Sequence, residues 1–224
     1  MKKTLRKLAL LTVAMVLGFA GCEDDFGPEH DRGNNTVGDI GNISGTIAGH
    51  DYVDLGLPSG LKWATCNVGA ATPEDYGNYY AWGETTTKSS YTEENCRTYG
   101  VSMNDISGNA TYDAARANWG STWRMPTKAE MQELENNCTW TWTAQGGING
   151  YKVTGPNGNS IFLPAAGFCS GSSHSEVGEF GYYWSSKPYE SGTYCAYRLD
   201  FDSGGHDVLW INRSYGHTVR PVSE

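Results

Sequence analysis

The side chains best suited to contact another molecule lie near the C-terminus. Tyr197–Asp202 and Asp207–Arg213 both alternate apolar and polar residues, and Ser203-Gly204-Gly205 between them is a tight-turn sequence. The pattern predicts a β-hairpin, because side chains point alternately to the two faces of a strand. We expect the inward positions to be Tyr197, Leu199, Phe201, Val208, Trp210 and Asn212.

The outward side chains of this hairpin would form a mixed surface. They are Arg198, Asp200, Asp202, Asp207, Leu209, Ile211 and Arg213. Two apolar side chains among exposed charges indicate a contact site. The neighbouring side chains that we add to this contact face are Tyr183, His206, Tyr215 and His217. They would supply shape and hydrogen-bond complementarity, with aromatic and arginine anchors dominating. The alternative is that a loop covers this face.

The sequence gives little support for catalysis. None of its histidines forms a zinc-protease pair, and there is no nucleophile elbow, phosphate-binding loop or dinucleotide fingerprint. The aspartates around the hairpin could hold a divalent ion, but a solvated turn is the simpler interpretation. We therefore expect a binding protein rather than an enzyme, with no metal and no other cofactor.

Residues 1–21 have the parts of a secretion signal. A basic start precedes the nonpolar run Leu8–Phe19, which is shorter than the roughly 20 residues that a membrane span needs. Small residues and then Cys22 follow, which resembles the lipobox of bacterial lipoproteins. The resemblance implies cleavage before Cys22 and lipid attachment to it, with more than one acyl chain for a stable anchor. The alternative is an ordinary signal peptide followed by a coincidental cysteine.

Residues 22–50 lack sustained periodicity and are predicted to be an acidic tether. Glu23-Asp24-Asp25 resembles the acidic surface-export signal of Bacteroidetes lipoproteins, which implies an outer-membrane protein facing the cell exterior. The chain has 16 Lys and Arg against 25 Asp and Glu, and loss of four bases with the signal leaves 12 against 25, or −13. This acidity excludes nucleic acid as a partner and leaves the lipid anchor as the only expected membrane contact.

One domain is expected over residues 51–224. A hairpin should turn at Gly56–Gly60, and 85–108 reads as a long loop. A short helix is predicted over 112–118 and a longer one from the capping box at Thr127 to Asn137. Three strands joined by tight turns follow within 139–163, and the last strand candidates are 182–185, 194–202, 206–213 and 218–222. The fold class is α+β, with short helices, small antiparallel sheets and long loops.

Several ordered motifs between Asp51 and Glu224 carry a family resemblance. They are Asp54-Leu-Gly-Leu-Pro-Ser-Gly-Leu-Lys-Trp-Ala-Thr-Cys-Asn-Val-Gly69, Tyr79-Tyr-Ala-Trp-Gly-Glu84, Ala117-Asn-Trp-Gly120, Trp123-Arg-Met-Pro-Thr127, Asn157-Gly-Asn-Ser-Ile-Phe-Leu-Pro-Ala-Ala-Gly167, Tyr182-Tyr-Trp-Ser-Ser186 and Val219-Arg-Pro-Val222. Together they resemble the Fibrobacter succinogenes major paralogous domain. That family looks like the C-type-lectin-fold group, which includes formylglycine-generating enzymes and variable proteins of diversity-generating retroelements.

The resemblance implies a C-type-lectin-like fold but not a single activity. Trp210-Ile-Asn212 only hints at the calcium-lectin signature, because Arg213 stands where an acidic residue is expected. Cys169 and Cys195 are the only candidates for a formylglycine-type cysteine pair, and their surroundings do not match that motif. Calcium-dependent sugar binding and catalysis are therefore not supported.

Five cysteines remain after Cys22, so at least one must be unpaired or form an intermolecular bond. Cys66 and Cys138 lie within framework motifs and are the candidate disulfide. Their bond would close a loop of about 70 residues and contribute about 3–4 kcal/mol in the chain-entropy treatment. The alternative is two separate buried thiols.

The sequence-based hypothesis is a surface lipoprotein that binds an external protein or glycan through the C-terminal hairpin face. The outward set and its neighbours Cys195, Gly204, His206, Ser214 and His217 contain only residue types that adenine mutagenesis of AAC-type codons yields, as in retroelement-diversified proteins. A structural subunit of a surface fibre or envelope assembly is the second hypothesis. An enzyme of formylglycine-generating type is the third.

Overall fold

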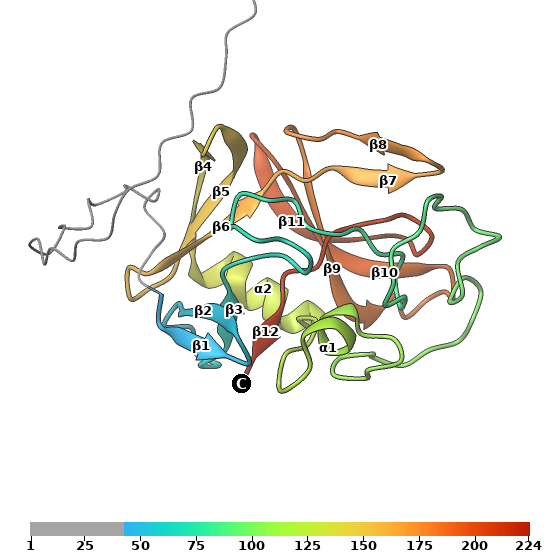
Figure 1. Cartoon of the computed structure of the whole chain (residues 1–224), viewed down its shortest axis with the longest axis horizontal. Helices are drawn as coiled ribbons and strands as arrows, with labels where there is room; N and C mark the ends of the chain where they lie inside the picture. The colour runs from blue at the N-terminus through green and yellow to red at the C-terminus, as the bar shows by residue number, and fades with distance from the viewer. Residues whose placement is uncertain (1–42) are drawn as a thin grey trace, which may run out of the picture. The chain divides into compact units, whose positions relative to one another are not determined.

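A computed structural model describes residues 43–224, and these form an α+β arrangement with two helices and four small antiparallel sheets (Figure 1). The predicted signal peptide, Cys22 and most of the predicted tether lie outside the described residues. Neither described helix is long and apolar enough to cross a membrane.

The N-terminal sheet joins the two ends of the described chain. Its strands are β1 (Gly45–Ile47), β2 (His50–Asp54), β3 (Lys62–Ala64) and β12 (Val222–Ser223), in the order β1-β2-β3-β12. Pairing of β2 with β3 confirms the predicted hairpin, and Gly56 and Gly60 take the positive φ values of 68° and 69° that its turn requires. Because β1 pairs with β2, this sheet also includes residues from the C-terminal part of the predicted 22–50 tether.

Buried Arg220 holds this sheet to the rest of the molecule. Its guanidinium donates to the carbonyl oxygens of Ala64, Thr65 and Phe162 at 2.7–3.0 Å and to the side-chain oxygen of Asn67 at 2.8 Å. Four acceptors satisfy the charge inside the protein, where an unpaired cation would cost several kcal/mol. Arg220 therefore joins the loop after β3 to the middle of the chain.

The longer helix, α2 (Lys128–Asn137), starts where its sequence predicts. The Thr127 side chain accepts from the Glu130 backbone N–H while the Glu130 carboxylate accepts from the Thr127 N–H, which is a complete capping box. Met131 and Leu134 are buried on its inner side. The shorter helix, α1 (Ala114–Trp119), is capped by the Asp113 carboxylate, close to the predicted position.

The meander that follows α2 confirms the three strands predicted within 139–163. Its strands are β4 (Thr139–Gln145), β5 (Ile148–Thr154) and β6 (Ser160–Pro164), in that order. Gly146 and Gly147 turn between the first two strands with φ values of 57° and 84°, which favour glycine. A small hairpin of β7 (Phe168–Ser170) and β8 (Ser173–Ser175) comes next and was not predicted.

The terminal sheet contains β9 (Gly181–Pro188), β10 (Cys195–Asp202) and β11 (Gly205–Asn212), in the order β11-β10-β9. The turn predicted at Ser203-Gly204-Gly205 is present: Asp202 pairs with Gly205, so Ser203 and Gly204 form a two-residue turn. Gly181 faces the Phe201 ring so closely that a Cβ atom would lie 2.0 Å from it. The ring therefore occupies the space that any larger residue at 181 would need.

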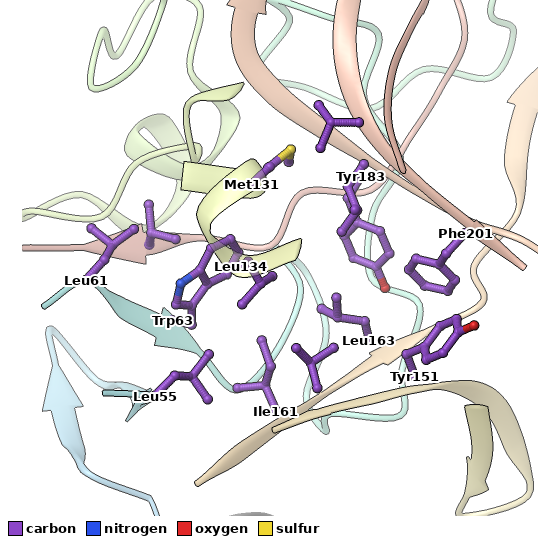
Figure 2. Close-up of a cluster of buried hydrophobic side chains, with 14 of the residues drawn as sticks. Leu55, Leu61, Trp63, Met131, Leu134, Tyr151, Ile161, Leu163, Tyr183 and Phe201 are labelled. Carbon is purple, nitrogen blue, oxygen red and sulfur yellow. The ribbon is translucent and has the colours of Figure 1, made fainter. Parts of the chain in front are cut away.

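The main core lies between α2, the meander, the N-terminal sheet and the terminal sheet (Figure 2). Trp63, Met131, Leu134, Ile161, Leu163 and Phe201 are among its buried side chains. A second cluster, around Trp82, Met125 and Trp184, lies on the other side of the terminal sheet. The segment 65–113 supplies part of it and contains no helix or strand, which agrees with the long loop predicted over 85–108.

Cys66 and Cys138 are free thiols, so the predicted disulfide is absent from the structure. Cys138 caps the end of α2 and packs against the main core, whereas the Cys66 sulfur lies 3.5 Å from the hydroxyl oxygen of Thr65. Burial raises the pKa of the Cys138 thiol to about 11. The other three described cysteines are free as well.

Candidate recognition site on the terminal hairpin

The register of the terminal sheet assigns each side chain to one of two faces. Leu199 lies opposite Val208 and Arg198 lies opposite Leu209. Tyr197, Leu199 and Phe201 are buried in the main core, which confirms the inward set on β10. The opposite side is the outer face of the sheet, and it carries the polar side chains of the hairpin.

The part of the outer face nearest the turn is open. We call this part the hairpin face; it comprises Asp200, Asp202, Asp207 and Leu209. Leu209 is 43% exposed, and Asp207 is exposed beside it. A shallow hollow of about 230 Å³ lies here, lined by these four side chains together with Phe201, Gly205 and His206. One apolar side chain thus stands among three carboxylates.

Two of these carboxylates are held by backbone groups of the turn. The Asp202 carboxylate accepts from the Gly204 N–H at 2.6 Å, and the Asp207 carboxylate accepts from the Val208 N–H at 2.7 Å. Each contact uses one oxygen, so the other oxygen stays available to a ligand. Among residues 43–224, no three His, Cys, Asp or Glu side chains are arranged to hold a metal ion.

Arg198 anchors the edge of the hairpin face rather than presenting a free cation. Its Nη2 lies 2.6 Å from the Asp200 carboxylate, its Nη1 lies 3.2 Å from His217 Nε2, and its guanidinium covers the Tyr182 ring at 4.0 Å. Both side chains of the ion pair are largely buried, at 12% and 18% exposure. Burial raises the pKa of Asp200, and the positive charge of Arg198 opposes that rise.

The remainder of the outer face is covered. Ile211 is half-buried because it packs against the second cluster, to which Ala196 and Trp184 belong. The backbone of His217 pairs with that of Tyr80, which brings the long 65–113 segment across this end of the sheet. The alternative of a covering loop is therefore correct for one half of the face.

Three predicted contact residues are buried and cannot meet a ligand at the surface. They are Tyr183, Arg213 and His217, at 1%, 1% and 0% exposure. Tyr183 lies opposite Leu199 and so faces the core, where its hydroxyl donates to the Pro164 carbonyl at 2.7 Å. Arg213 and His217 follow the end of β11 at Asn212, so strand alternation no longer sets their direction. Their prediction as contact residues was wrong.

His217 lies in an aromatic box. The rings of Tyr182, Trp184, Phe168 and Tyr215 all lie within 6.3 Å of its ring centroid. Burial and the nearby positive charge of Arg198 hold the pKa of His217 well below its usual range. The imidazole is therefore neutral at ordinary pH, and its Nδ1 has no hydrogen-bond partner. Tyr215 itself is half-buried and lines a separate hollow of about 290 Å³.

His206 and Trp210 lie on the inner side of β11, in register with Phe201 and Tyr197. His206 stacks on Trp140 with ring centroids 4.3 Å apart, so it reaches the hollow only from the turn. Trp210 was predicted to be buried, yet it is 51% exposed and stacks on Tyr189. Because β11 is the edge strand, its inner side extends beyond the core. Nothing in the alternation could have indicated this exposed aromatic pair.

Comparison with known proteins gives one family match. The family described as Domain of unknown function (DUF8237) matches residues 148–222. The matched stretch starts with β5 and ends within β12, so it includes the whole terminal sheet and the hairpin face. No curated protein and no solved structure matches the chain.

Proposed function

We propose that this protein is a surface lipoprotein without catalytic activity, whose hairpin face binds an external protein. The observation that carries the proposal is the exposed Leu209 beside the carboxylates of Asp202 and Asp207, around a hollow of about 230 Å³. An exposed apolar side chain surrounded by charge is typical of a small contact site.

The charge of the face defines the partner. Three aspartates and no free cation line it, since Arg198 is neutralised by Asp200. A partner segment that carries Lys or Arg next to an apolar side chain would complement it, and the acidic chain as a whole would speed the encounter.

The proposed fold is C-type-lectin-like. Two short helices, small antiparallel sheets, the long 65–113 segment and the pairing of β12 with β3 near the chain ends support this assignment. The thiols of buried Cys169 and half-buried Cys195 support a non-enzymatic role, because burial raises the pKa of both and a thiolate is the reactive form.

An array of immobilised peptides tests the proposal. Each basic peptide carries one central apolar residue, and its acidic counterpart differs only in having Asp or Glu in place of Lys or Arg. We expect the purified protein to bind the basic peptides in preference to the acidic ones. Asp202→Asn/Asp207→Asn keeps both turn hydrogen bonds, because the amide oxygen still accepts, but removes two charges. This variant and Leu209→Ser should each weaken binding by about tenfold.

The matched control is Glu94→Gln/Glu224→Gln, which removes two exposed charges away from the hairpin face and should leave binding unchanged. Equal binding of basic and acidic peptides, or full binding by both hairpin variants, would refute the proposal. Concentration-dependent self-association lost in Leu209→Ser would instead favour an envelope assembly subunit.

The anchor has its own test. Cells expressing the protein should incorporate a fatty-acid label into it, and Cys22→Ala should abolish the label while the signal peptide remains uncleaved at that position. Unchanged labelling of the variant would contradict a lipid attached at Cys22.

A further inference from the structure

β11 is an edge strand that lacks the usual protection of a sheet edge. Its only strand neighbour in the described chain is β10, and the two pair over the whole of Gly205–Asn212 without a bulge. The strand contains neither proline nor lysine. Native sheets commonly protect a free edge with such residues, with a bulge or with a very short strand, as at β1, which has only 3 residues. The edge of β11 is therefore suited to receive another strand.

The backbone groups that point away from β10 belong to alternate residues of β11. In an antiparallel ladder, every second residue directs both its N–H and its C=O to the neighbouring strand. One pair beyond the end of β11, the Arg213 N–H donates to the Tyr194 carbonyl at 2.9 Å, so the odd-numbered residues bond to β10. The even-numbered residues direct their groups to the open edge, and they include His206, Val208 and Trp210.

These outward groups are largely unused within residues 43–224. The N–H and C=O of His206 and Trp210 have no backbone partner there, and the Val208 N–H donates only to the neighbouring Asp207 carboxylate at 2.7 Å. Asp207 is exposed, and so are Leu209 and Trp210, at 43% and 51%. This stretch of the edge is thus open to solvent, with one carboxylate turned towards it.

The side chains of β11 define the strand that would fit. A strand added to the edge would place alternate side chains beside Asp207 and Leu209 on the outer side, and the others beside His206 and Trp210 on the inner side. The first pair favours Lys or Arg together with an apolar residue. This is the combination that suits the hairpin face, so one extended segment could contact the edge and the face together.

We propose that an extended basic segment of the external protein pairs with β11 as an additional antiparallel strand. This inference rests on the proposed function and adds the mode of binding to it. The antiparallel direction continues that of the sheet and is the more stable pairing per residue. A second copy of this chain fits less well, because both copies would carry the same net charge of −9.

Methylation of backbone nitrogens in a probe peptide tests the pairing. The probe is acetyl-Thr-Lys-Thr-Leu-Thr-Lys-Thr-amide, in which Lys and Leu share one side of a strand and Thr the other. In the proposed pairing the Thr side chains lie beside His206 and Trp210, and the Thr N–H groups point to β11. Methyl groups on the nitrogens of the two central threonines should therefore weaken binding at least about tenfold.

The matched control peptide carries its methyl groups on the nitrogens of Leu and of the Lys that follows it. These nitrogens face away from β11 in the proposed pairing, so this peptide should bind as tightly as the unmethylated probe. Isothermal titration calorimetry with the purified protein measures all three affinities. Amide hydrogen exchange gives a second measurement: the probe should slow exchange at His206 and Trp210, but not at Asp207 and Leu209, which already bond to β10.

A substitution in the protein tests the same edge from the other side. Trp210→Pro removes an N–H that takes no part in the ladder to β10, and an edge strand tolerates proline at such a position. Trp210→Ala is the matched control, because it loses the same side chain and keeps the N–H. We expect Trp210→Pro to bind the probe at least about tenfold more weakly than Trp210→Ala. The methylated peptides need no variant, so they decide the question even if Trp210→Pro does not fold.

Equal affinity of the two methylated peptides, unchanged exchange at His206 and Trp210, or equal probe binding by folded Trp210→Pro and Trp210→Ala would each overturn the strand pairing. If basic peptides were still selected over acidic ones, the proposed function would stand and the hairpin face would bind through side chains alone. Loss of that selection would instead mean that the proposed function itself fails.

Discussion

Leu209 and Trp210 are adjacent and similarly exposed, at 43% and 51%, yet they lie in opposite surroundings. Leu209 stands among aspartates opposite Arg198, whereas Trp210 lies opposite Tyr197 and stacks on the Tyr189 ring. The difference teaches that an edge strand can present two separate surfaces, one acidic and one aromatic. A central strand has no such freedom, because both of its sides are covered.

The largest expected effect is a difference in the free energy of unfolding when a buried and an exposed leucine of the same hairpin are each replaced by alanine. Leu199→Ala should lower the free energy of unfolding by about 3 kcal/mol, because it leaves a cavity in the main core. Leu209→Ala should change it by less than about 0.5 kcal/mol, because that side chain is already in water. Urea denaturation of both variants measures the contrast, and equal losses would show that the outer face is not open.

A smaller loss of stability is expected for a substitution at the border between the hairpin face and the covered half of the outer face. Arg198→Ala should lower the free energy of unfolding by about 2 kcal/mol, because it leaves the largely buried Asp200 carboxylate without its partner. Asp200→Asn keeps the shape of the side chain and should cost less. Urea denaturation measures this loss as well. If Arg198→Ala lowered the free energy of unfolding no more than Leu209→Ala, Arg198 would be a free surface cation. The hairpin face would then be less acidic than described.

The third effect concerns pH and appears only below neutrality. The folded state keeps the pKa of His217 below that of the unfolded chain, so the unfolded chain binds more protons once the pH falls below about 6.5. The free energy of unfolding should therefore decrease between pH 7.5 and 5.5.

His217→Gln should make this decrease smaller, although some should remain because the pKa values of His50 and His206 are lowered too. A slope that stays the same in His217→Gln would mean that the imidazole is not sealed beside Arg198. Denaturation at several pH values in one buffer system measures it.

Local chemistry in the sequence predicts local structure well in this chain. The Thr127 capping box starts α2, the glycine pair at 146–147 turns the meander, and Ser203-Gly204 turns the terminal hairpin. Each of these features depends on a few consecutive residues, so the local sequence is enough to predict it.

Contacts made over long sequence distances were not predictable in the same way. Alternation correctly assigned Leu199 and Leu209 to opposite faces, but it could not tell that 65–113 covers half of the outer face or that Trp210 extends past the core. Arg213 and His217 were misplaced because the chain leaves the strand after Asn212 and turns inwards. The candidate site was therefore half predicted, and the stacking of Trp210 on Tyr189 was not predicted.

The position of Arg220 affects the time at which the domain can fold. This residue and β12 follow all the other described strands along the chain, yet they complete the sheet that β1–β3 begin and bind carbonyl groups near Thr65 and Phe162. A nascent chain that has not yet reached this closing strand lacks its guanidinium and cannot complete these native contacts. Such a delay would suit the export that we propose for this protein, because an exported polypeptide must pass through a narrow secretion channel before it folds.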